Sequence, residues 1–265
     1  MNDRVMVLLL CASSTLNVLF LVFSIFFLIR KGGLRYLYFK IFPTNSQEEF
    51  YNPYSLHKKS QFELLPKSDS DIIFLGDSLT DEGEWSELLE NPNVKNRGIG
   101  GDTTDLILNR LDTILASKPK KVFLMVGIND MLGLGKGVKT IKQIRLVYSA
   151  ILTEFQNQVP NTEVFLESVL PVHNKITRYW QDNDNILQLN LHLRKLAKEF
   201  SYHYIDVYSH LSDSENQLDI CYTEDGLHLN GRGYLKWKEA VEEFVNDTNK
   251  KVLENISTED VFTEC

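Results

Sequence analysis

The sequence has little cysteine and no excess of positive charge. Its three cysteines are too few and too scattered to form a disulfide framework or a cysteine-ligated zinc site (Cys11, Cys221 and Cys265). Acidic residues outnumber basic ones by 36 to 28, so the chain lacks the basic surface that nucleic-acid binding needs. Internal repeats and low-complexity tracts are absent as well. A hydrophobic fraction of 43% with 24% charged residues fits one packed domain with an appendage, and excludes a fibrous or disordered chain.

The appendage is a long apolar run at the N-terminus. Val5 to Ile29 comprises 25 residues without a formal charge. As a helix this run would be about 37 Å long, which predicts a transmembrane anchor over residues 1–31. A cleaved signal peptide is the alternative, but the run is longer than the apolar region of such a peptide and no A-x-A-like site follows it. Basic residues are more numerous after the run than before it, a bias that slightly favours a cytoplasmic location for the main domain.

The rest of the chain divides into three parts. Residues 32–69 lack sustained periodicity and predict a linker that packs against the domain or lies at a membrane interface. Residues 70–247 alternate short apolar runs with stretches of helical spacing and predict one domain, and residues 248–265 form a C-terminal tail. The strands are expected at 71–76, 93–95, 121–126, 163–169 and 203–207, and the helices at about 103–116, 139–158, 185–200 and 232–247.

This alternation indicates an α/β fold. We expect a three-layer α/β/α sandwich with a mainly parallel five-stranded sheet, because helices that connect parallel strands cover both faces of the sheet. In such sheets the functional site lies beyond the carboxyl ends of the strands. Polar residues that directly follow a strand are therefore the first candidates for chemistry.

The first candidate follows the strand at 71–76. Gly76-Asp77-Ser78-Leu79 leads at once into a helical stretch, so Ser78 is expected near a helix N-terminus, which favours developing negative charge. An Asp/Ser helix cap without chemistry explains this tetrapeptide equally well. The motif is not a G-x-S-x-G elbow, since the position after Leu79 is Thr80, and this disfavours an α/β-hydrolase.

Two further turns carry hydrogen-bond donors. The glycine-rich turn at 96–103, which contains Gly101, exposes backbone N–H groups that could bind a phosphate or an oxyanion. It has neither the spacing nor the lysine of a nucleotide-binding loop. After the strand at 121–126, Asn129 can aim its amide group into the same cleft, although a simple Asn-Asp turn is an equal alternative.

A carboxylate and an imidazole precede the last helix. Asp225 and His228 are three residues apart, so on a helical turn the carboxylate can reach one ring nitrogen and leave the other free as a base. With a distant serine such as Ser78 they make up an acyl-transfer triad.

Three more polar residues are candidates for lining the cleft. His173 follows the strand at 163–169, whereas the other histidines suit a helix, the start of a strand or the surface. Asn174 lies next to His173 in the chain, and Asp77 lies next to Ser78.

Together these motifs carry a family resemblance. They resemble the SGNH or GDSL hydrolases over residues 70–245, specifically bacterial acyl esterases and platelet-activating-factor acetylhydrolase-like proteins, through Gly76-Asp77-Ser78-Leu79, Gly101-Asp102, Gly127-x-Asn129-Asp130 and Asp225-x-x-His228. The resemblance implies a flavodoxin-like sandwich with Ser78 as nucleophile, His228 as general base and Asp225 as its orienting carboxylate. It also implies an oxyanion hole formed by the N–H groups of Ser78 and Gly101 and the side chain of Asn129.

The resemblance predicts a serine esterase that hydrolyses short-chain acyl esters, acetyl esters above all, without a metal or an organic cofactor. The expected partners are a small acyl-ester substrate and, through the apolar N-terminal segment, a membrane; nucleic acid is not expected. A lysophospholipase or another lipid esterase similar to platelet-activating-factor acetylhydrolase is the alternative. A ligand-binding module or a membrane scaffold leaves the serine, asparagine and histidine without a role.

Overall fold

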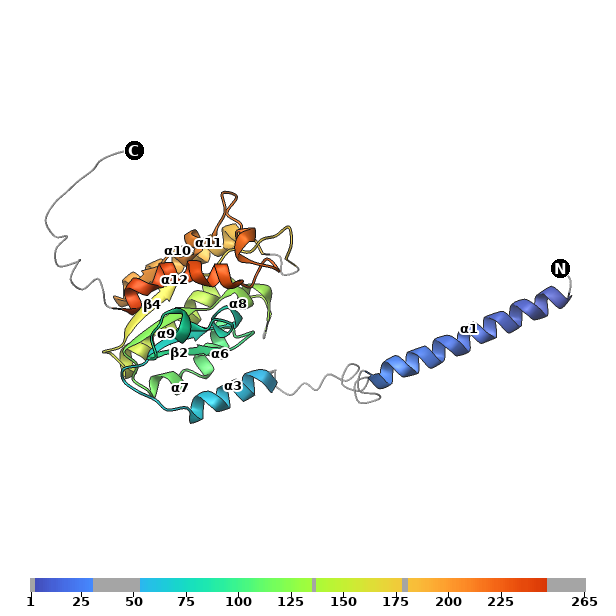
Figure 1. Ribbon diagram of the computed structural model, residues 1–265, viewed down its shortest axis with the longest axis horizontal. Helices are drawn as coiled ribbons and strands as arrows, with labels where there is room; N and C mark the ends of the chain where they lie inside the picture. Colours follow the sequence, from blue (N-terminus) through green and yellow to red (C-terminus); the bar gives the residue numbers. More distant parts are fainter. Residues whose placement is uncertain (1–2, 31–52, 135–136, 178–180, 247–265) are drawn as a thin grey trace. The chain divides into compact units, whose positions relative to one another are not determined.

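Figure 1 shows a computed structural model of the chain, which describes residues 3–30, 53–134, 137–177 and 181–246. The chain forms two compact units, Met1–Glu49 and Phe50–Cys265. The described part of the first unit is the helix α1 (Asp3–Arg30).

The prediction of a transmembrane anchor over residues 1–31 finds no support. A bilayer requires about 20 consecutive, predominantly apolar residues in helical form. Among the helices of the described residues, none reaches both the length and the apolar character that a membrane span needs. Within α1 the apolar run is interrupted by a cluster of polar residues, Ser13, Ser14, Thr15 and Asn17.

The second unit is built on a five-stranded sheet. Its strands are β1 (Ile72–Gly76), β2 (Val94–Gly98), β3 (Lys121–Met125), β4 (Glu163–Glu167) and β5 (His203–Ile205). They lie in the order β2-β1-β3-β4-β5, and every neighbouring pair is parallel. The predicted α/β fold with a parallel five-stranded sheet is confirmed. Gly76 pairs with both Gly98 and Met125. The carboxyl ends of the neighbouring strands β2, β1 and β3 therefore lie side by side at one end of the sheet.

Helices connect the strands and cover both faces of the sheet (Figure 1). Those after the first unit are α3 (Pro53–Leu64), α4 (Ser78–Asp81), α5 (Trp85–Leu88), α6 (Thr104–Asn109), α7 (Asp112–Leu115), α8 (Ile128–Leu132), α9 (Ile141–Gln158), α10 (Asn183–Phe200), α11 (Val207–Leu211) and α12 (Gly231–Val245), with a 3₁₀ turn at Ile220–Tyr222. The long helices begin at clear caps. Thr140 and Gln143 form a capping box at α9, and the Asn230 side chain caps α12. The helix expected at 103–116 is divided into α6 and α7.

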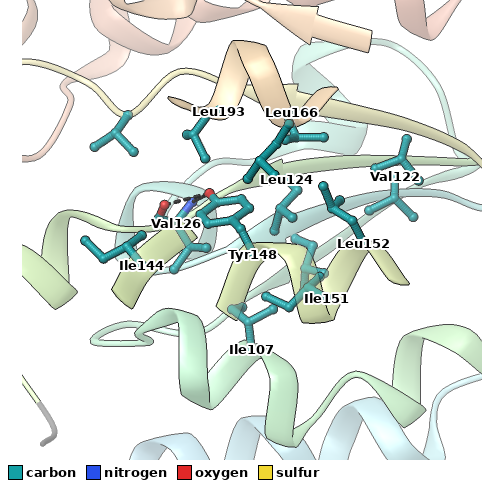
Figure 2. Packing of buried hydrophobic residues seen from close by; sticks show 14 of the residues in the cluster. Ile107, Val122, Leu124, Val126, Ile144, Tyr148, Ile151, Leu152, Leu166 and Leu193 are labelled. Atoms are coloured by element: carbon teal, nitrogen blue, oxygen red, sulfur yellow. Dashed lines mark hydrogen bonds between the residues drawn. The ribbon is translucent and has the colours of Figure 1, made fainter. Parts of the chain in front are cut away.

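One face of the sheet packs against α6, α9 and α10. Alternate strand residues point to this face, among them Val122 and Leu124 of β3, and Figure 2 shows them beside Tyr148 and Ile151 of α9. The Tyr148 hydroxyl is buried, and it donates to the Val126 carbonyl at 2.7 Å and accepts from the Val126 N–H at 3.2 Å. This pairing anchors α9 directly after β3, at the edge of the sheet where the strands end.

The other face packs against α5 and α12 through aromatic side chains. Phe74, Phe123 and Phe165 stack across three neighbouring strands, with ring centroids 4.7 and 4.6 Å apart. Trp85 of α5 stacks on Phe74, and it meets Trp237 of α12 edge-on at 4.7 Å. Aromatic contacts of this kind stabilise the fold by about 0.5–1.5 kcal/mol each beyond the area that they bury. The row therefore holds α5 and the last helix, α12, on the same face of the sheet.

The segment expected to be a linker, residues 32–69, includes the helix α3. Its Phe62 is buried, and the guanidinium of Arg97, on β2, lies over the Phe62 ring at 5.0 Å. Helix α3 thus packs against the domain. The first part of the predicted linker and the C-terminal tail at 248–265 lie outside the described residues.

Candidate active site

The predicted nucleophile lies where β1 turns sharply into α4. A Cβ atom at Gly76 would collide with the Thr80 side chain and with the Met125 carbonyl, so only glycine allows this close approach of helix and strand. The Asp77 side chain caps α4 by accepting the Leu79 N–H at 3.1 Å. Ser78 begins the helix and is half-buried. This local geometry places the Ser78 hydroxyl at the carboxyl edge of the sheet.

The predicted acid–base pair lies in the loop before α12. One Asp225 oxygen accepts the backbone N–H groups of Leu227 and His228, at 2.9 and 2.8 Å. The other oxygen lies 2.8 Å from Nδ1 of the His228 ring. The expectation that these residues share a helical turn is wrong, because α12 begins only at Gly231 and the side chain of Asp225 itself folds the loop. The three-residue spacing brings the two groups together by a local turn instead.

Ser78, His228 and Asp225 form a continuous chain of polar contacts. The His228 Nε2 atom lies 3.1 Å from Ser78 Oγ, while Nδ1 faces the carboxylate. With the ring proton on Nδ1, Nε2 is the acceptor for the serine hydroxyl. Partial burial acts to raise the pKa of Asp225, but its hydrogen bonds from His228 and Leu227 outweigh burial and lower the pKa below the ordinary 3.8. Asp225 is therefore ionised at neutral pH and favours a positively charged imidazole.

The turn after β2 carries a backbone donor. Gly101 has a positive φ of 84°, which favours glycine, and a Cβ there would point into open space. Within the described residues no acceptor is recorded for the backbone N–H of Gly101 or for that of Ser78. These two N–H groups are available to a substrate oxygen.

The side chain of Asn129 forms a hydrogen bond with the same turn. It lies in α8, directly after β3, and its side chain is almost completely buried. Its amide nitrogen donates to the Asp102 carbonyl at 2.9 Å, which uses one of the two N–H bonds of the amide. The structure therefore brings the turn at Gly101 and the Asn129 side chain together.

A buried ion pair braces this turn. Arg110 Nε donates to the Asp102 carboxylate at 2.7 Å, and its Nη2 donates to the carbonyls of Arg97 and Gly76 at 2.8 and 3.2 Å. Burial raises the pKa of Asp102 to about 6, although the Arg110 charge and hydrogen bond oppose the increase. One guanidinium thus connects the ends of β1 and β2 to the turn that carries Gly101.

The three candidates for cleft lining have other contacts. Asp77 is only 1% exposed, so it does not lie on the surface of a cleft; burial, opposed by the Leu79 N–H, raises its pKa to about 8. His173 holds the loop of Asp225, because its backbone N–H donates to the Gly226 carbonyl at 2.8 Å. Asn174 bonds to Gln181 through both its oxygen and its nitrogen.

Sequence reasoning missed three residues around this site. Arg110 sits in a helical stretch like many surface arginines, and Asp81 and Tyr54 lie outside the motifs. The one available signal was the three-residue spacing of Asp81 from Ser78, which places the two on one side of a helical turn. No cluster of histidine, cysteine and carboxylate side chains that could hold a metal ion is found in the described part of the chain.

Comparisons with known proteins identify the family and the fold. The model of the GDSL-like lipase/acylhydrolase family matches residues 74–236. The chain is 28% identical to the platelet-activating factor acetylhydrolase IB subunit alpha2 of Rattus norvegicus over 184 residues, which are 67% of this chain and 76% of the relative. Its fold is similar to that of a GDSL-like lipase from Bacteroides thetaiotaomicron, with a TM-score of 0.63, 20% identity and coverage of 72% of this chain and 97% of the other. It is also similar to a catalytic mutant of an acetylxylan esterase from Geobacillus stearothermophilus, with a TM-score of 0.56, 18% identity and coverage of 68% and 96%.

Proposed function

The chain belongs to the GDSL-like lipase/acylhydrolase family and is a carboxylic ester hydrolase, and on this premise we propose that it hydrolyses short-chain acyl esters, acetyl esters above all, with Ser78 as the nucleophile. The observation that carries the proposal is the chain of contacts from Ser78 Oγ through the His228 ring to Asp225, at 3.1 and 2.8 Å. A serine that only capped a helix would not be expected to face an imidazole that is oriented by a carboxylate.

In the first half of the reaction His228 Nε2 accepts the Ser78 hydroxyl proton as Oγ attacks the ester carbonyl. The carbonyl π electrons move to oxygen and form a tetrahedral oxyanion. In this proposal the N–H groups of Ser78 and Gly101 and the amide of Asn129 stabilise this charge, which their location at the ends of neighbouring strands supports. His228 then gives its proton to the leaving alcohol, and the acyl group remains on Ser78.

Water repeats the sequence in the second half. His228 removes a proton from water, hydroxide attacks the acyl carbonyl, and the oxyanion forms again at the same donors. Its collapse breaks the bond to Ser78 Oγ, which recovers the proton from His228 as the carboxylic acid leaves. Asp225, ionised because its hydrogen bonds lower its pKa, stabilises the imidazolium in both halves.

The preference for acetyl esters is supported by two relatives whose names specify acetyl groups, the acetylhydrolase subunit and the acetylxylan esterase. A lipid esterase similar to platelet-activating-factor acetylhydrolase is the second candidate, because the relative is named a platelet-activating factor acetylhydrolase subunit. Both candidates use the same triad, so they differ only in the leaving group and in the length of the acyl chain.

The nucleophile is tested with Ser78→Ala. We expect the purified variant to have no measurable ester hydrolysis and no reaction with a fluorophosphonate probe, at an unchanged melting temperature. Ser86→Ala, a change of an exposed serine on α5, is the matched control and should retain both activities. A folded Ser78→Ala protein with wild-type turnover would remove Ser78 from the mechanism.

The substrate class is tested with a series of aryl esters of increasing acyl length, together with an acetylated sugar and a lysophospholipid. We expect kcat/KM to be highest for acetate and to fall steadily as the acyl chain is lengthened. A maximum at long chains, or turnover of the lysophospholipid alone, would instead favour the lipid esterase.

A further inference from the structure

The carboxylate of Asp81 joins three parts of the molecule. Asp81 ends α4, the helix that Ser78 begins. Its Oδ2 atom accepts the backbone N–H of Gly100 at 3.0 Å and the hydroxyl of Tyr54 at 2.5 Å. Its Oδ1 atom lies 2.6 Å from the ammonium group of Lys58. One side chain therefore connects the nucleophile helix, the turn that carries Gly101, and the helix α3.

Two of these partners come from outside the family domain. Tyr54 and Lys58 belong to α3, which precedes the residues that the family model matches. They are four residues apart, so they lie on the same side of the helix and can reach one carboxylate together. The Lys58 ammonium also lies over the Tyr54 and Phe62 rings, at 5.9 and 5.4 Å from their centroids. These contacts hold the charged face of α3 against Asp81.

The Tyr54 ring and Ser78 both lie beside Gly100. A Cβ atom placed on Gly100 would lie 3.7 Å from Tyr54 Cε1 and 3.8 Å from Ser78 Cβ. The side of Gly100 on which a Cβ would lie thus faces both Tyr54 and Ser78. Its peptide group leads directly to the N–H of Gly101, so a constraint on the Gly100 amide also restricts the direction in which the Gly101 donor points.

The negative charge of the Asp81 carboxylate must be offset by its partners if it is not to oppose catalysis. A carboxylate next to the donors of an oxyanion hole would repel the charge that develops in the transition state. The positive charge of Lys58 offsets this repulsion. Burial, and then the hydrogen bond to Asp81, raises the pKa of Tyr54 to about 12, so its hydroxyl remains a donor to the carboxylate at neutral pH.

We propose that α3 completes the oxyanion side of the active site, with Tyr54 and Lys58 as positioning residues that hold Asp81 and, through it, the Gly100–Gly101 turn. This inference rests on the proposed function, because it concerns the stabilisation of the oxyanion that forms after attack by Ser78. It extends the functional unit of the protein beyond the family domain to a helix that lies N-terminal to it.

The first test measures kcat and KM of the full chain on a short aryl ester after Tyr54→Phe and Lys58→Met. We expect kcat to fall about 10-fold for each variant, less than the 10²–10³ typical for loss of an oxyanion donor, with KM almost unchanged. Lys58→Arg keeps the charge and should retain most of kcat. Lys59→Met is the matched control, because it removes the same charge from the same helix, and it should have wild-type kcat.

A double-mutant cycle shows whether the effect passes through the carboxylate. If Tyr54 and Lys58 act by holding Asp81, then Tyr54→Phe and Lys58→Met should lower kcat far less in an Asp81→Asn background than in the wild type. Melting temperatures and kcat per folded molecule are measured for every variant, at a temperature where all are folded. A purely structural helix would lower the melting temperature of these variants and leave kcat per folded molecule unchanged.

Two outcomes overturn the inference. The first is a wild-type kcat in the folded Tyr54→Phe and Lys58→Met variants. The second is a loss of kcat that is equally large in the wild-type and the Asp81→Asn backgrounds. Failure of the proposed function has a different signature, because Ser78→Ala would then retain activity.

Discussion

Ser78 Oγ lies 3.1 Å from His228 Nε2, although 150 residues separate the two in the chain. This distance depends on how α12 packs against the start of the domain. The hydroxyl of Tyr234, in α12, donates to the Leu79 carbonyl of α4 at 2.8 Å. The edge-on contact of Trp85 with Trp237 holds the same two regions together in the core. The contact between Ser78 and His228 is thus a result of the packing of the last helix.

The role of Asp225 is tested by Asp225→Asn. Removal of the carboxylate should lower kcat strongly, by about 10⁴ by analogy with a serine protease triad, because the imidazole loses the partner that fixes its tautomer and stabilises its cation. KM should change much less. Wild-type activity should also decline toward acid pH, since a protonated His228 cannot act as a base, while the lowered pKa of Asp225 keeps that carboxylate ionised. An Asn variant that melts early but turns over normally would contradict the triad.

The oxyanion role of Asn129 is tested by Asn129→Ala. We expect kcat to fall by about 10²–10³ at similar KM, because the amide would act on the transition state and not on the ground state. The lost bond to the Asp102 carbonyl should also lower the melting temperature slightly. Asn185→Ala removes an exposed amide on α10 and serves as the control, with no expected change in kcat. Equal kcat in the two variants would argue against a donor at Asn129.

Arg110→Leu tests the buried ion pair. The change leaves the Asp102 carboxylate buried without a partner and should lower the free energy of unfolding by about 3–5 kcal/mol. Arg110 holds the pKa of Asp102 down, so the pKa should rise above about 6 in the variant. The loss of stability should therefore be larger at pH 8 than at pH 5, where the carboxyl can be neutral. Arg145→Leu, which breaks an exposed pair with Glu199, should cost less than about 1 kcal/mol at either pH.

Glu167→Gln tests a buried carboxyl of β4. Burial raises the pKa of Glu167 from 4.5 to about 8, against the opposing hydrogen bond from Trp237. Between these pH values the unfolded chain is ionised while the folded one keeps its proton, so the stability of the wild type should fall as pH rises through this window. Glutamine is neutral throughout and retains an acceptor for Trp237. The melting temperature of the variant should therefore rise relative to the wild type from pH 5 to pH 8; a constant difference would exclude this titration.

Much of the domain follows from local sequence pattern. The apolar runs that became β1 and β3 are buried along their whole length, and β4 is buried from its second residue onward. Such runs are readable because a strand covered on both faces is predominantly apolar. Polar motifs at strand ends were informative for the same reason. Parallel strands finish at a common edge, so Ser78 and Asn129, which follow adjacent strands, had to lie near one another.

Local sequence pattern therefore predicts which segments form the sheet and which polar groups follow them. The contacts that hold those groups in place depend on tertiary packing. Arg110 braces the turn of Gly101, and Tyr54 and Lys58 of α3 converge on Asp81, through contacts between residues that are distant in the chain. The local sequence pattern predicts whether a residue is buried and whether it can form hydrogen bonds, because both depend on the residue itself and on its near neighbours in the chain. Which residue pairs with a buried charge depends on how whole helices and strands pack against one another. A short stretch of sequence therefore does not predict that partner.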